Sequence, residues 1–79
     1  MKLYGYANDG TPIEDIVPLE LAEVTLACAP DELRRIAKFL ASAADKMEAR
    51  GADYNHEHLA DKDRSFRHSP HFVVANPSA

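Results

Sequence analysis

The chain has 79 residues, with nine Lys and Arg against thirteen Asp and Glu, which gives a formal net charge of −4. This length accommodates one small domain, residues 1–79, and excludes a two-lobed enzyme, because domains rarely form below about 50 residues. The acidic balance disfavours direct binding to nucleic acid, since contacts with phosphates need a basic surface. An acidic surface is better suited to a basic protein partner.

The single cysteine, Cys28, cannot form a disulfide within one chain, which indicates a reducing compartment. The N-terminus does not resemble a secretory signal, and no apolar run reaches the roughly 18 residues of a membrane-spanning helix. We therefore expect a cytoplasmic protein without membrane contact. Because so short a chain buries little surface, we expect homodimerisation to add stability.

The first predicted element is a short strand over residues 2–7, where aromatic and apolar side chains precede a turn. Asn8-Asp9-Gly10 is a strong turn signal, because these residue types tolerate positive φ. Residues 11–18 carry two prolines and acidic side chains, so we predict a loop there.

Residues 19–29 predict a second, half-buried strand, because apolar side chains alternate with others along most of this stretch. The side chains on the apolar phase are Ala22, Val24, Leu26 and Cys28. Leu19 and Leu21 fall on the opposite phase. This fits either a bulge near Ala22 or a separate short segment before the strand.

A long helix is predicted from Pro30 to near Arg50. Proline is favoured at the first helical position, and Asp31 and Glu32 place negative charge beside the positive end of the helix dipole. Gly51 provides a C-terminal cap. Apolar residues repeat at helical spacing and predict the face that packs on a sheet: Leu33, Ile36, Ala37, Leu40, Ala43, Ala44 and Met47.

Charged and histidine residues dominate the stretch from Asp53 to Ser69, in which residues 61–66 could form one turn of helix. Residues 71–75 are β-branched and aromatic and predict a last strand. The order is ββα(x)β, an α+β class with two layers: one long helix on a small three-stranded sheet, antiparallel or mixed. We expect the homodimer to form through a sheet edge.

Two histidines, His56 and His58, form an H-x-H pattern flanked by carboxylates. In an extended segment both would point to one side and could share a metal ion, whereas on a helix they would diverge by about 200°. The other nearby ligand types have no diagnostic spacing; they are Asp53, Asp61, His68 and His71. We therefore predict that the protein has no metal or other cofactor. The alternative hypothesis is a small metal-binding protein or metal-dependent enzyme that uses His56 and His58.

The usual signatures of catalysis are missing from this sequence. It has no Gly-rich phosphate loop, no nucleophile elbow and no Cys–His pair. A histidine beside a carboxylate could act in acid–base chemistry, but any short acidic loop with histidine offers such pairs. We therefore expect a protein that binds and does not catalyse.

Three features together resemble a known family: the opening Lys2-Leu3-Tyr4-Gly5-Tyr6, the block over residues 21–40, and His56-Glu57-His58-Leu59-Ala60-Asp61. They are similar to the immunity protein 32 family of bacterial polymorphic toxin systems. The likeness runs from about Lys2 to about Asn76. It implies an α+β protein that binds and neutralises a cognate protein toxin.

The resemblance supplies no contact residues, so the partner-binding surface is predicted on physical grounds. Loops on a rigid scaffold often carry binding, and a toxin site that grips nucleic acid is basic. We expect Glu57, Asp61 and Asp63 to occupy such a cationic site, with Tyr54 as an aromatic anchor. The predicted partner-binding residues are Asp53, Tyr54, His56, Glu57, His58, Asp61 and Asp63.

Overall fold

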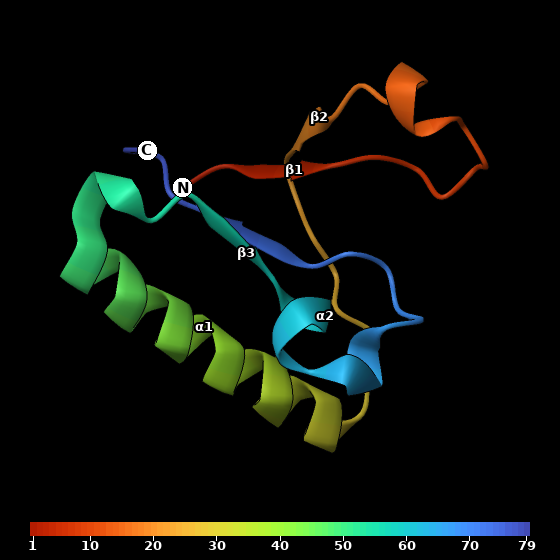
Figure 1. Cartoon of the computed structure of the whole chain (residues 1–79). Coiled ribbons are helices and arrows are strands. Elements are labelled where there is room, and N and C mark those ends of the chain that lie inside the picture. Colours follow the sequence, from red (N-terminus) through yellow and green to blue (C-terminus); the bar gives the residue numbers. More distant parts are fainter.

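The long helix is confirmed in the computed structural model, which describes all residues 1–79 (Figure 1). Helix α1 spans Pro30–Arg50, with Pro30 at its first position. The backbone N–H of Ala29 donates to Glu32 Oε1 at 2.9 Å, which fixes the start of the helix. Gly51 ends it at φ 58°, and the Gly51 N–H donates to the carbonyl of Met47.

Four short strands form two separate antiparallel sheets. Strand β1, Leu3–Gly5, pairs with β2, Leu19–Leu21. Strand β3, His56–His58, pairs with β4, Val73–Ala75. The α+β class is thus confirmed, whereas the single three-stranded sheet and its strand order are not.

The predicted second strand is shorter than residues 19–29. The chain bends at Ala22, and the strand ends at Leu21. Residues 22–28 belong to neither sheet and run as an irregular connection down to α1 (Figure 1). Of the two alternatives for Leu19 and Leu21, the structure therefore has the separate short segment.

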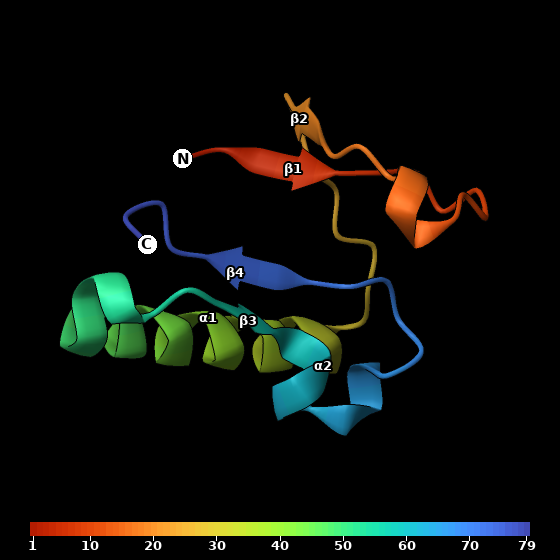
Figure 2. The same ribbon diagram turned by 45° about the horizontal axis from the view of Figure 1, so that its top comes forward.

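The β3–β4 sheet lies over α1, and β1 and β2 lie beyond it (Figure 2). The short helix α2, Leu59–Lys62, follows β3 directly. The Leu59 N–H donates to the carbonyl of Phe72 at 2.9 Å, which ties the start of α2 to the segment before β4. A single-turn helix over Arg64–Phe66 comes next. Residues 61–66, predicted as one turn, are thus divided between two turns separated at Asp63.

The core lies between α1 and the segment after β3. Its buried cluster consists of Ile36, Phe39, Leu59 and Phe66, and the partly buried side chains against it are Cys28, Phe72 and Val74. Phe39 meets Phe72 edge to face, with ring centroids 6.5 Å apart. The predicted apolar stripe is only half used, because Leu33 is 44% exposed and Leu40 is 43% exposed.

None of the helices combines the length and apolar character that a membrane crossing requires. Only six of the 79 residues are buried, so the core between α1 and the segment after β3 is small. The β1–β2 ribbon stands apart from the rest of the fold (Figures 1 and 2). Its apolar side chains, such as Tyr4 and Leu19, are exposed in the single chain. An isolated two-stranded ribbon is only marginally stable in water.

Candidate functional site

A polar groove of about 430 Å³ lies where the end of α1 meets β3 and α2. Its lining residues are Lys46, Arg50, Asp53, Tyr54, Asn55, His56, Glu57, His58, Asp61 and Lys62. The groove therefore brings together every predicted partner-binding residue except Asp63. It also includes Lys46 and Lys62, which the sequence analysis did not single out.

The loop between α1 and β3 is held in place by Asn76, which directly follows β4. Its side-chain Nδ2 donates to the carbonyls of Gly51 and Tyr54, each at 2.9 Å. Its backbone N–H donates to the carbonyl of Asn55 at 2.8 Å. This clamp fixes the loop on the scaffold and so positions the side chains that line the groove.

Glu57 is the central charge of the groove, with only 13% of its side chain exposed. Its Oε2 accepts from Lys46 Nζ at 3.0 Å and lies 3.5 Å from Lys62 Nζ. Burial raises the pKa of Glu57, but the lysines and the nearby Tyr54 hydroxyl outweigh burial and leave the pKa below its ordinary value. Glu57 is therefore ionised and neutralised within the chain.

The floor of the groove contains two polar atoms without a hydrogen-bond partner, the Tyr54 hydroxyl and Glu57 Oε1. Tyr54 is 2% exposed. Burial raises its pKa, and the neighbouring Glu57 charge raises it further, although the two groups make no hydrogen bond of ordinary geometry. Both atoms are buried and lack a hydrogen-bond partner of ordinary geometry, which is unusual for buried polar groups.

The histidines lie where the extended reading of H-x-H predicts. His56 and His58 are both in β3, with ring centroids 5.4 Å apart, and His58 is 6.0 Å from the ring of His71. His56 Nδ1 is 3.1 Å from Asn55 Oδ1. No group of three or more His, Cys, Asp or Glu side chains is placed to hold a metal ion.

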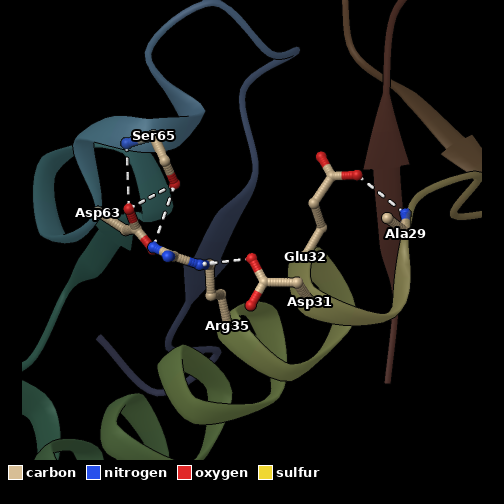
Figure 3. Close-up of polar contacts among 6 residues, drawn as sticks. All are labelled: Ala29, Asp31, Glu32, Arg35, Asp63 and Ser65. Carbon is tan, nitrogen blue, oxygen red and sulfur yellow. Dashed lines mark hydrogen bonds and ion pairs between the residues drawn. The ribbon is translucent and has the colours of Figure 1, made fainter.

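Asp63 lies away from the groove, in a polar cluster that joins α1 to the segment after α2 (Figure 3). Arg35 Nη1 donates to Asp63 Oδ2 at 3.0 Å, and Arg35 Nε donates to Asp31 Oδ2 at 3.0 Å. Ser65 donates to Asp63 Oδ1 through its backbone N–H at 3.0 Å and its hydroxyl at 2.6 Å. The Ser65 and Arg35 contacts lower the pKa of Asp63.

Two carboxylates of the groove, Asp53 and Asp61, are exposed and form no ion pair. Asp53 comes from the segment before β3, and Asp61 comes from α2. Unpaired carboxylates retain their full negative charge toward an approaching partner.

Comparison of the chain with models of protein families, with curated protein sequences and with solved structures gives no match.

Proposed function

We propose that this protein neutralises a bacterial toxin by binding it, as the resemblance to the immunity protein 32 family implies. The observation that supports this proposal is the pair of exposed, unpaired carboxylates, Asp53 and Asp61, in one groove. A toxin that acts on nucleic acid presents a cationic site to which such a pair is complementary. The net charge of −4 would add attraction during encounter.

The contact set differs in detail from the seven predicted residues. Of those seven, Asp53, His56 and Asp61 are available to a partner, because all three are exposed. Tyr54 and Glu57 form the floor, and their unpartnered hydroxyl and Oε1 are buried. Asp63 does not line the groove; its contact with Arg35 joins the segment after α2 to α1.

Binding is favoured over catalysis by the state of Glu57. A general base works best when its pKa lies near the operating pH, but the pKa of Glu57 lies below its ordinary value. Two lysines also occupy its Oε2. The groove's best placed carboxylate is thus engaged in an ion pair and is a poor proton acceptor.

The experiment has two stages. The tagged chain captures its partner from native lysate, mass spectrometry identifies it, and the captured protein is expressed alone and together with the chain. We expect expression alone to stop growth and the wild-type chain to restore it. Asp53→Lys with Asp61→Lys should abolish the rescue.

The matched control is Glu14→Lys with Asp15→Lys, which makes the same charge change in the loop before β2. Both residues are exposed and lie outside the groove. This variant should still rescue growth. If the captured protein is harmless, or if both double variants rescue equally, the proposal is wrong.

A metal-binding role for His56 and His58 is the second candidate, favoured by the 5.4 Å separation of their rings. A zinc site usually takes three or four protein ligands, so the single chain would need ligands from elsewhere. Elemental analysis of purified protein tests this role. Stoichiometric metal that disappears in His56→Ala with His58→Ala would favour it over toxin binding.

A further inference from the structure

Residues 22–28 have the sequence of a strand but no strand partner. None of the backbone hydrogen bonds of the chain involves these seven residues. All but Cys28 are exposed, so a row of free N–H and C=O groups faces solvent. An unpaired stretch of this kind is a template for pairing with another chain.

The side chains of this segment favour pairing with an apolar cover. Val24 is 53% exposed and Leu26 is 45% exposed, although both share the alternation phase of Cys28, which packs against the core. Val24 and Thr25 are β-branched and suit a strand. Glu23 is the only charged residue of the segment.

The exposed area of the molecule indicates how much surface such a cover would bury. A compact monomer of 8.7 kDa exposes about 4,700 Å². This chain exposes 6606 Å², an excess of about 1,900 Å². Obligate homodimers bury about 1,000–2,500 Å² from each chain, so the excess is what one dimer interface would remove.

The dimensions of the chain agree with that excess. Its radius of gyration is 13.5 Å, against about 11.6 Å for a compact domain of this length. The largest exposed apolar side chains lie on the β1–β2 ribbon, its loop and the segment itself, and include Tyr4, Ile13, Val17, Leu19 and Val24. The uncovered surface is therefore concentrated on the N-terminal part of the molecule.

We propose that two copies of this chain pair antiparallel through residues 22–28, about a two-fold axis at Thr25, with the two Thr25 residues as a hydrogen-bonded pair. In this register Val24 lies opposite Leu26 of the partner subunit, and Glu23 lies opposite Ala27 of the partner subunit. No like charges meet across the axis, and the one surface complements itself, as a symmetric dimer requires. The pairing satisfies the free backbone groups on one edge of the segment and places Val24 and Leu26 beside apolar side chains of the partner.

The first test is the mass of the purified chain by sedimentation equilibrium. We expect twice the chain mass of 8.7 kDa. Thr25→Pro removes the N–H at the centre of the pairing without breaking any hydrogen bond within the chain, so its mass should fall to one chain. Thr25→Val keeps the N–H and should remain a dimer. Far-UV circular dichroism checks that α1 persists in both variants.

Cross-linking tests the register and does not depend on the proline variant folding. Directly opposed residues in an antiparallel pair lie about 4.5–5.5 Å apart, which suits a disulfide. With Cys28→Ala removing the native thiol, Thr25→Cys should form a disulfide dimer under mild oxidation. Glu23→Cys should not, because its two copies would lie about 13 Å apart.

A dimer that Thr25→Pro dissociates and Thr25→Cys cross-links supports the proposal. A single-chain mass at every concentration overturns it. A dimer that survives Thr25→Pro, or that cross-links through Glu23→Cys in place of Thr25→Cys, also overturns it, because the chains would then meet in another register or through another surface.

Discussion

At the scale of single residues, Asp63 belongs to the predicted binding segment but stabilises the fold instead. Its two oxygens bind Arg35 and Ser65, and these contacts lower its pKa. A carboxylate whose pKa is lower in the folded state contributes stability above its unfolded pKa of about 4. That contribution is lost as the pH falls through the folded pKa.

We therefore predict that Asp63→Asn destabilises the protein at neutral pH and that its difference from wild type shrinks in acid. Urea unfolding at several pH values measures the free energy of unfolding of both proteins. Asp45→Asn is the control, because Asp45 is exposed on α1 and forms no ion pair. A difference that stays constant from neutral pH into acid would contradict the assignment.

Tyr54 carries a second prediction at this scale. Its hydroxyl is buried without a hydrogen-bond partner, and such a group costs about 1–3 kcal/mol. Tyr54→Phe should therefore leave stability unchanged or raise it by about 1 kcal/mol, whereas Tyr4→Phe on the exposed ribbon should have no effect. Thermal and urea unfolding measure both. A clear loss of stability in Tyr54→Phe would mean that the hydroxyl is hydrogen-bonded to Glu57.

At the scale of elements, Gly51 joins the end of α1 to the groove loop. Its φ of 58° and ψ of −134° strain any residue with a Cβ, although a Cβ there would meet no neighbouring atom. Gly51→Ala should cost about 1–3 kcal/mol. Gly10→Ala also sits at positive φ, but its loop makes no tertiary hydrogen bond and can relax, so its cost should be smaller. Equal costs in urea unfolding would show that the Asn76 clamp does not constrain Gly51.

The elements that sequence predicts well are those whose signals are local. Pro30, Glu32 and Gly51 lie at the two ends of α1 and define them. The strand pairing of the segment after Leu21 depends on residues far away in the chain, so alternation alone predicts a strand that has no partner here. The same holds for the groove: most of its lining residues lie within residues 53–61, so a local pattern in the sequence predicts them together.

The remaining parts of the site could not be predicted from local pattern. Lys46 reaches Glu57 from α1, 11 positions away, and Arg35 reaches Asp63 across 28 positions. Helical periodicity places both cations on an exposed side of α1 but does not say which carboxylate they meet. Because of these contacts, Glu57 and Asp63 are in ion pairs, whereas Asp53 and Asp61 are in none.

At the scale of the whole molecule, the acidic charge and the free carboxylates of the groove support one account, in which the chain acts by binding a cationic partner. Attraction of this kind weakens as salt screens the charges. The groove lies at the end of α1 near Asn76, whereas the proposed dimer surface is the segment before α1. The two surfaces are separate, so binding and self-association can be tested independently.

The most direct measurement is calorimetric titration of the captured toxin with the chain at low and high salt. The account predicts a one-to-one complex that Asp53→Lys with Asp61→Lys weakens at least about tenfold, with the larger loss at low salt. The control, Glu14→Lys with Asp15→Lys, should bind like wild type. Equal affinity for both double variants would contradict the groove as the contact surface.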